Sequence, residues 1–350
     1  MGVMIDTAPI RPEESFDEDR VAAYLLEELP DLFGRGPIEF AQFPGGAANL
    51  TYLAKSPRIE LVLRRAPLGG VARGGHDMER EHRVLSRLWS VYPLAPRSYH
   101  YCADPEVLGK PFFVMERRHG HVIRSAWPAR IADDPSRRRR VAEGLIDGLA
   151  ELHLADPDEA DLGDLGHPDG FVERQIAGWS QRWEAAKTGE VPDMERARAL
   201  LEARPPTPQA VTMLHNDYKL DNTMVNDAGE LVAVFDWDMA TRGDPLVDLG
   251  TLLSYWPDPE SPTYPIFGER SVALAPDLAK EDAAERYRRK TGFDLSSVGY
   301  YEGLALFRIA VIIEQIYARY AAGQTTDVRF AKFEPIPRLL AKAAVATLGG

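Results

Sequence analysis

A short polar loop between runs of apolar residues constrains this chain more than any other feature. The loop spans residues 215–222 and reads HNDYKLDN, with apolar runs at 211–214 before it and 224–225 after it. Short apolar runs bounded by turn residues are typical of β-strands, so the loop is predicted to lie between strands. A further apolar run at 231–235 follows a turn and ends at Asp236. The spacing therefore predicts a hairpin with Asp236 at its end.

Three polar side chains of this segment are of the types that phosphoryl transfer requires. A kinase uses one carboxylate to accept the proton of the attacking hydroxyl, and an amide oxygen with a second carboxylate to hold magnesium on the nucleotide phosphates. Asp217, Asn222 and Asp236 stand in that order. The alternative, that they are turn and cap residues in a solvated loop, would be favoured for any one of them alone. The ordered set favours a phosphotransferase.

The segment resembles the aminoglycoside phosphotransferase and choline kinase superfamily, whose catalytic core is similar to that of protein kinases. The resemblance rests on residues 215–217 with Asn222, on Phe-Asp-Trp at 235–237, and on Gly-Asp-Pro at 243–245 with Asp248. It implies a bilobal α+β fold, with a small β-rich N-lobe and a larger α-rich C-lobe.

The resemblance also implies roles for individual residues. Asp217 is the expected catalytic base, Asn222 and Asp236 are the expected magnesium ligands, and Asp248 is expected to be a buried carboxylate that holds the loop backbone. His215 is expected to support the loop by bonding to its backbone. The family usually has Gly where this chain has Asn216, and we expect little effect from the difference.

The order of the predicted elements agrees with two lobes. Strands are expected at 38–43, 50–54, 59–63 and 111–115, with an amphipathic helix at 78–89 before the last of them. This N-lobe is assigned to residues 1–116. The C-lobe, residues 117–350, reads as mainly helical outside the hairpins, with helices expected at 137–154, 171–186, 193–203, 278–291, 298–320 and 336–348.

Small residues between the first two predicted strands mark a candidate nucleotide loop. Gly45, Gly46, Ala47, Ala48 and Asn49 would let backbone N–H groups approach phosphate oxygens. A Gly-Gly pair can equally serve an ordinary hairpin turn. The position of the stretch, where the resemblance requires a nucleotide loop, favours phosphate binding.

A kinase of this architecture places a basic side chain on its third strand, over the nucleotide phosphates and paired with a helix glutamate. The candidates here are Arg64 or Arg65, with Glu81, and the sequence leaves the choice between the two arginines open. The wider family more often has Lys at this position, but arginine can hold phosphate through its bidentate fork. Met115 and Glu116 would follow as the hinge, whose backbone reads the base of ATP or GTP.

Lys219 lies two residues after the proposed base. Protein kinases place a lysine there that touches the transferring phosphoryl group, and a cation at this point would stabilise charge in the transition state. An exposed loop lysine is an equally good interpretation.

Composition narrows the class of protein. The net charge of −13 argues against binding to a nucleic-acid backbone. No apolar run approaches the ~20 residues of a membrane span, and the start of the chain lacks the pattern of a signal peptide. The single cysteine, Cys102, excludes an internal disulfide and favours a reducing compartment. A cytoplasmic protein is therefore expected, of undetermined oligomeric state.

The sequence predicts a magnesium-dependent kinase that transfers the γ-phosphoryl group of ATP or GTP to an alcohol group of a small molecule. The superfamily suggests an aminoglycoside acceptor. The N-lobe stretch and residues 218–221 look more like the phosphotransferase domains fused to acyl-CoA dehydrogenases, which would imply a hydroxyacyl-CoA or related acceptor. The rival class is a pseudokinase that binds a nucleotide or ligand without catalysis. A protein kinase is disfavoured, because Trp237 and Asp238 follow the metal-binding acid where Phe-Gly would be expected.

Overall fold

A computed structural model of the chain describes residues 6–44, 49–67, 77–256, 260–261, 263–267, 272, 274, 277–325 and 327–350. The chain divides into two compact units. The first unit comprises residues 1–119 with 158–162 and 233–240, and the second comprises 120–157, 163–232 and 241–350.

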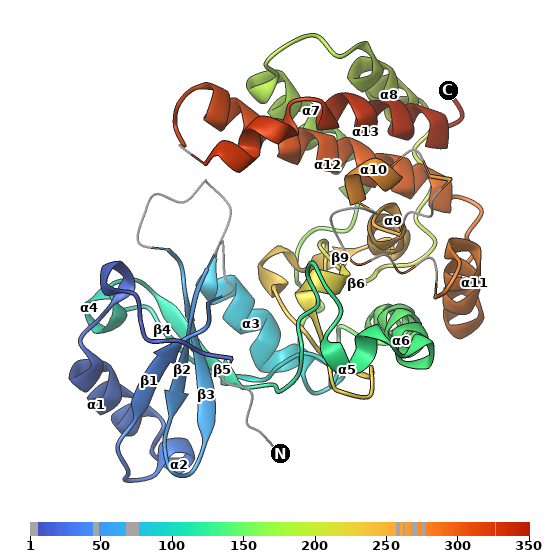
Figure 1. The fold of residues 1–350 in the computed structure, drawn as a ribbon. Coiled ribbons are helices and arrows are strands. Elements are labelled where there is room, and N and C mark those ends of the chain that lie inside the picture. The colour runs from blue at the N-terminus through green and yellow to red at the C-terminus, as the bar shows by residue number, and fades with distance from the viewer. Residues whose placement is uncertain are drawn as a thin grey trace. The chain divides into compact units, whose positions relative to one another are not determined.

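The first unit is built on a five-stranded antiparallel sheet (Figure 1). Its strands stand in the order β1-β2-β3-β5-β4, and their bounds are β1 Glu39–Gln42, β2 Leu50–Lys55, β3 Glu60–Arg65, β4 Ser98–Cys102 and β5 Phe112–Glu116. Side chains alternate between the two faces of a strand. In β3, Leu61 and Leu63 join a buried cluster with Val21 and Leu25 of helix α1. Val62 and Arg64 therefore point to the opposite face.

The α-helices among the described residues of the first unit are α1 Glu18–Glu28, α2 Pro30–Phe33, α3 Met78–Leu88 and α4 Pro105–Leu108. Helix α3 begins where the Asp77 carboxylate accepts a hydrogen bond from the backbone N–H of Arg80, which satisfies a free donor of its first turn. Its buried side includes Glu81, Val84 and Leu88, and it packs against β4 and β5. Glu81 therefore lies between α3 and the sheet.

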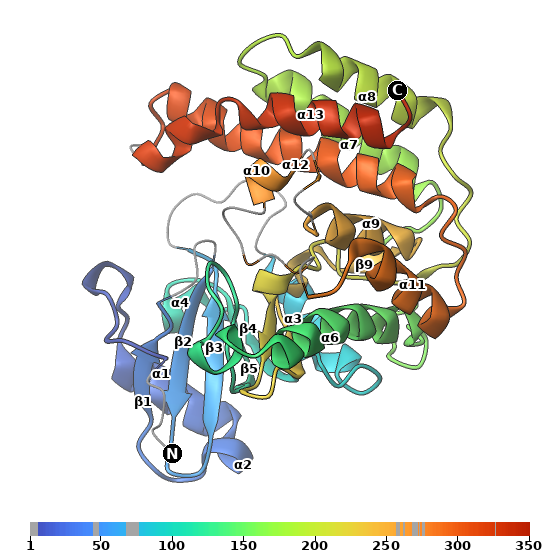
Figure 2. The same ribbon diagram turned by 45° about the vertical axis from the view of Figure 1, so that its right-hand side comes forward.

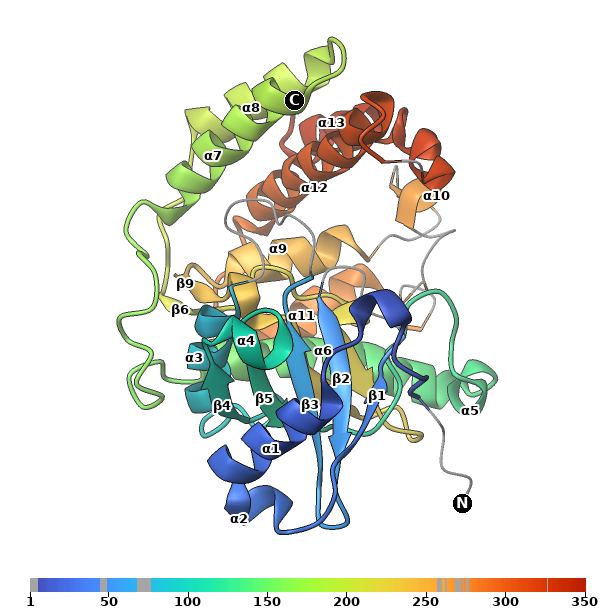
Figure 3. The ribbon, with the colours of Figure 1, turned by 90° about the vertical axis from the view of Figure 1, so that its left-hand side faces the viewer.

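The second unit is mainly helical. Its helices are α5 Ala129–Ala132, α6 Pro135–Leu154, α7 Phe171–Ala186, α8 Pro192–Ala203, α9 Leu246–Ser254, α10 Tyr264–Phe267, α11 Lys280–Thr291, α12 Val298–Ala321 and α13 Ile336–Thr347. The long helix α12 packs against α7, α9 and α13, and Figure 3 shows α12 and α13 side by side. Helix α11 packs against α6 (Figure 2). Helix α12 is thus the common packing partner of α7, α9 and α13.

Two small sheets frame the polar loop. Strand β6, Thr212–Leu214, pairs with β9, Thr241–Gly243, and strand β7, Thr223–Val225, pairs with β8, Leu231–Val234. The loop 215–222 connects β6 to β7, as the apolar runs on either side of it predicted. A tight turn joins β7 to β8, closed by a hydrogen bond of 2.9 Å from the Asn226 N–H to the Glu230 carbonyl oxygen.

The predicted α+β fold is confirmed, and most predicted elements lie within two residues of the observed ones. Strands β4 and β9, helix α9 and the four-residue helices α2, α4, α5 and α10 were not predicted. Helix α9 is buried on all sides over residues 246–254, so its sequence lacks the apolar and polar faces that reveal a helix. Among the described residues, no helix combines the length and the apolar character needed to cross a bilayer.

Candidate active site

The loop of the second unit brings two predicted residues, Asn222 and Lys219, into contact with Asp217. The Asn222 side-chain nitrogen donates hydrogen bonds of 2.9 Å to both the main-chain oxygen and the carboxylate of Asp217. The Lys219 ammonium forms an ion pair with the same carboxylate and lies 4.0 Å from Asp221. Because Asn222 uses its nitrogen on Asp217, its side-chain oxygen is the atom left to bind a metal.

Asp248, the first-turn acid of α9, holds the backbone of this loop. Its carboxylate is fully buried and accepts hydrogen bonds from the backbone N–H groups of His215, at 2.6 Å, and Asn216, at 2.7 Å. Burial alone would raise the pKa of Asp248, but His153 and the N–H of His215 hold that pKa below its ordinary value. The imidazole of His215 accepts a hydrogen bond of 3.2 Å from the Asp217 N–H. Both predicted support residues therefore bond to loop backbone.

Asn216 occupies a backbone conformation that explains its identity. Its φ of 66° lies in the left-handed region. Glycine enters that region without steric cost, and asparagine enters it more readily than other side chains do. Asparagine therefore suits this backbone conformation, as glycine would.

The first unit gathers the other predicted charged residues. The Arg64 Nε atom lies 3.0 Å from the Glu81 carboxylate, and the same guanidinium forms an ion pair with Asp236. Burial raises the pKa of Glu81 to about 7, although the Arg64 guanidinium opposes that rise. Asp236 has a φ of 70° and so, like Asn216, adopts the left-handed conformation that favours glycine. Such backbone conformations are concentrated at functional sites.

The two adjacent arginines of β3 point to opposite faces of the sheet. Arg65 is 1% exposed, and its guanidinium donates to the carbonyl oxygens of Glu14 and Leu108 and to the Tyr52 hydroxyl. Arg64 faces α3 and carries the contact to Glu81. The residue with the predicted glutamate partner is therefore Arg64.

Arg64 and Arg65 are expected to respond differently to substitution. Arg64→Met should weaken nucleotide binding at least about tenfold, because a charge-assisted phosphate contact contributes roughly 1.5–3 kcal/mol. Arg65→Met should instead lower the free energy of unfolding by about 1–3 kcal/mol, because it leaves buried polar groups without partners. Calorimetric nucleotide titration and urea unfolding of both variants measure the difference. Loss of nucleotide affinity in Arg65→Met alone would reverse the assignment.

Of the five residues of the predicted nucleotide loop, the structure describes one. Gly45, Gly46, Ala47 and Ala48 lie outside the described residues, and Asn49 is buried just before β2.

The predicted hinge residues lie in β5. Met115 is buried and pairs with Val62, while Glu116 ends the strand and forms an ion pair of 2.9 Å with Arg118. The first unit's main segment ends three residues later, at His119. A role for Met115 and Glu116 in base recognition stays a prediction.

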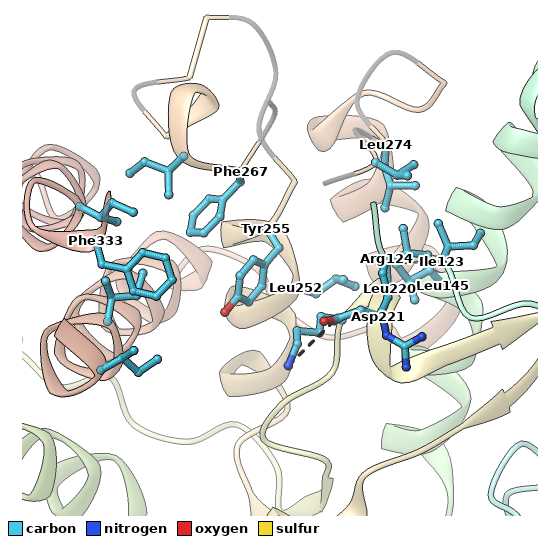
Figure 4. Close-up of a pocket in the computed structure, with 16 residues that line it drawn as sticks. Ile123, Arg124, Leu145, Leu220, Asp221, Leu252, Tyr255, Phe267, Leu274 and Phe333 are labelled. Carbon is cyan, nitrogen blue, oxygen red and sulfur yellow. Dashed lines mark ion pairs between the residues drawn. The ribbon is translucent and has the colours of Figure 1, made fainter. Parts of the chain in front are cut away.

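The second unit contains a cavity of about 520 Å³ beside the loop (Figure 4). Of the described side chains that line it, four are polar, namely Arg124, Lys219, Asp221 and Tyr255. The rest are aliphatic or aromatic: Ile123, Leu145, Leu220, Leu252, Ile266, Phe267, Val272, Leu274, Ile313, Ile316, Phe333 and Ile336. Burial raises the pKa of Asp221 despite the nearby Lys219. The lining residues are far apart in the sequence and form no common pattern, so the cavity could not be predicted from the sequence.

The donor set fits magnesium better than a transition metal. The described part of the chain has no group of three His, Cys, Asp or Glu side chains arranged around a common point. Mg²⁺ needs no such group, since it commonly binds one or two carboxylates together with water and substrate phosphates. Asn222 and Asp236 are oxygen donors of the required kind.

Sequence reasoning missed one charged residue near Asp217. Arg308 of α12 is 8% exposed, and its guanidinium lies 4.0 Å from the Asp217 carboxylate. A signal was present, because Arg308 is the single charged residue within the otherwise apolar stretch 303–313. A lone cation on such a helix needs a buried partner.

Comparisons with known proteins identify the family of the chain. The model of the phosphotransferase enzyme family matches residues 39–283. Mouse acyl-CoA dehydrogenase family member 10 is 29% identical over 92% of this chain and 30% of its own length. Its human relative, family member 11, is 27% identical over 97% of this chain and 44% of its own length. The chain thus spans less than half the length of these relatives.

Solved structures extend the comparison to the fold. A protein from Ralstonia eutropha that bears the provisional name aminoglycoside phosphotransferase is 25% identical, with a TM-score of 0.80 over 96% of this chain and 99% of its own. A mutant of aminoglycoside phosphotransferase APH(4)-Ia, in complex with ADP and hygromycin B, shares the fold at 16% identity and a TM-score of 0.61, over 94% and 99% of the two chains. The predicted resemblance is confirmed, and the chain belongs to the phosphotransferase enzyme family.

Proposed function

We propose that this chain is a magnesium-dependent kinase that transfers the γ-phosphoryl group of ATP or GTP to a hydroxyl group of a small molecule. The observation that carries the proposal is the environment of Asp217, whose carboxylate contacts both Asn222 and Lys219. In a general base, such contacts fix the orientation of the oxygen that receives the proton. A nucleotide as co-substrate is supported by the family's solved structures, one of which contains ADP.

Each proposed residue has one task. Asp217 accepts the proton of the acceptor's hydroxyl group. The hydroxyl oxygen of the acceptor bonds to the γ-phosphorus, and the bond between that phosphorus and the β-γ bridging oxygen breaks. Lys219 stabilises negative charge on the transferring group. Arg64, held by Glu81, binds the α- and β-phosphates. Magnesium, when bound by Asn222 and Asp236, would neutralise charge on the phosphates and on the leaving diphosphate.

The cavity favours an apolar acceptor over an aminoglycoside. Among the described residues that line it, one is a carboxylate, Asp221, and two are basic, Lys219 and Arg124. An acceptor with several ammonium groups would require an excess of acidic side chains for electrostatic complementarity. Aliphatic and aromatic walls instead suit the acyl chain of a hydroxyacyl-CoA-like acceptor. We therefore favour that class, which also agrees with the names of the chain's relatives.

Product detection by phosphorus NMR tests the function. The protein is incubated with magnesium, ATP or GTP, and a panel of aminoglycosides, choline-like amines and hydroxyacyl-CoA compounds. We expect a nucleotide-dependent phosphate ester with a hydroxyacyl-CoA and none with the amines. Binding of magnesium-nucleotide in a thermal-shift assay without any product would indicate the pseudokinase alternative. Absence of both product and binding would exclude a nucleotide-dependent role.

A further inference from the structure

We infer that Arg308 is a positioning residue that fixes the backbone of the catalytic loop beside Asp217. The inference rests on the proposed function, since it assigns a role in the same reaction. Neither the family motifs nor the comparisons point to this residue. It lies on α12, 91 positions after Asp217, among the buried residues of that helix.

Arg308 directs its charge at the loop. Its guanidinium donates a hydrogen bond to the carbonyl oxygen of Asn216 and lies 4.0 Å from the Asp217 carboxylate. It also stacks near Trp179 of α7, with its central carbon 5.6 Å from the ring centroid. A buried guanidinium is costly unless its donors are satisfied. The hydrogen bond to the Asn216 carbonyl oxygen satisfies one of these donors and ties α12 to the residue that precedes the proposed base.

Hydrogen bonds therefore fix both the N–H and the carbonyl oxygen of one loop residue, Asn216. Asp248 of α9 accepts the N–H of Asn216, and Arg308 of α12 binds its carbonyl oxygen. Asn216 has the left-handed φ of 66°, a conformation that persists where its surroundings enforce it. Two helices therefore set the direction in which the chain enters Asp217.

The same arrangement orients the carboxylate itself. Lys219 pairs with Oδ2 of Asp217, while Arg308 lies nearest Oδ1. Each oxygen thus has its own cationic neighbour, which disfavours rotation of the carboxylate. A misplacement of about 1 Å at a catalytic group can cost roughly 100-fold in rate, so loss of Arg308 should affect turnover more than nucleotide binding.

Three variants separate positioning from simple stabilisation. Arg308→Met removes the charge and the donors, and Arg308→Lys keeps a cation with fewer donors. Arg286→Met is the matched control, because Arg286 forms a half-buried bidentate ion pair with Asp147, at 2.6 and 2.7 Å, elsewhere in the second unit. The measurements are kcat, the KM for nucleotide, and amide hydrogen exchange across residues 215–219.

We expect Arg308→Met to lower kcat by about 10- to 100-fold with an unchanged nucleotide KM, and to speed exchange at Asn216 and Asp217. Arg308→Lys should recover part of kcat, and Arg286→Met should leave kcat unchanged. Equal kcat in Arg308→Met and Arg286→Met would overturn the inference. If the wild-type chain phosphorylates no acceptor, the proposed function is wrong. Amide hydrogen exchange still tests the loop contact in that case, and an unchanged exchange rate at Asn216 and Asp217 in Arg308→Met would overturn it.

Discussion

Asp217→Asn is expected to reduce kcat by about 10²- to 10⁴-fold, the usual contribution of a general base. The substitution keeps the shape of the side chain, and the new amide can still bond to Asn222 and Lys219, whose contacts to Asp217 are seen in the structure. The negative charge is lost, and with it the ability to accept a proton and the ion pair with Lys219, while the hydrogen bond from Asn222 can be kept. The KM for nucleotide and the thermal midpoint should therefore stay close to those of the wild type.

Steady-state kinetics with the best acceptor measures this effect. The control is Asp227→Asn, which changes an exposed acid in the turn between β7 and β8. Its kcat should stay near that of the wild type. A kcat in Asp217→Asn within a few-fold of the control would mean that the hydroxyl is activated by another group.

The second large effect is expected for Asp236→Asn. Asparagine tolerates the left-handed backbone that Asp236 adopts, so the variant should fold. Its amide is a much weaker magnesium ligand than a carboxylate, and a bound metal contributes several kcal/mol to transition-state stabilisation. We expect kcat to fall by roughly 100-fold or more and the magnesium concentration for half-maximal activity to rise.

Metal removal provides an independent measurement. In the wild type, EDTA should weaken nucleotide binding, whereas in Asp236→Asn binding should depend little on magnesium. The control Asp31→Asn, an exposed acid in the first turn of α2, should behave like the wild type. Equal magnesium dependence in all three proteins would contradict the assignment of Asp236 as a metal ligand.

Much of the candidate site could be predicted because it is local in sequence. The contacts of Asp217 with Lys219 and Asn222 span two and five residues, a range within which a loop between two strands constrains its own side chains. The hairpin that ends at Asp236 follows from apolar runs and a turn of defined length. Helices such as α7 and α12 were predicted with boundaries within one residue, because their apolar periodicity is long and regular.

Contacts between distant segments could not be predicted in this way. The choice between Arg64 and Arg65 depends on the register of β3, because a shift of one residue exchanges the two faces of a strand. The cavity draws its walls from residues between 123 and 336. The sequence of any one segment does not indicate which of these side chains line the cavity together.

The sequence alone indicated the family of this chain and the reaction class that we propose for it, since the order of an acid, an amide and a second acid between short strands is a local property. Only the tertiary structure decided which arginine meets Glu81, which helix supplies Arg308, and that the cavity beside Lys219 has mainly apolar walls. The physical reason is that these features depend on packing between elements far apart in the chain. Such packing is set by the burial of many side chains together rather than by the residues of one loop.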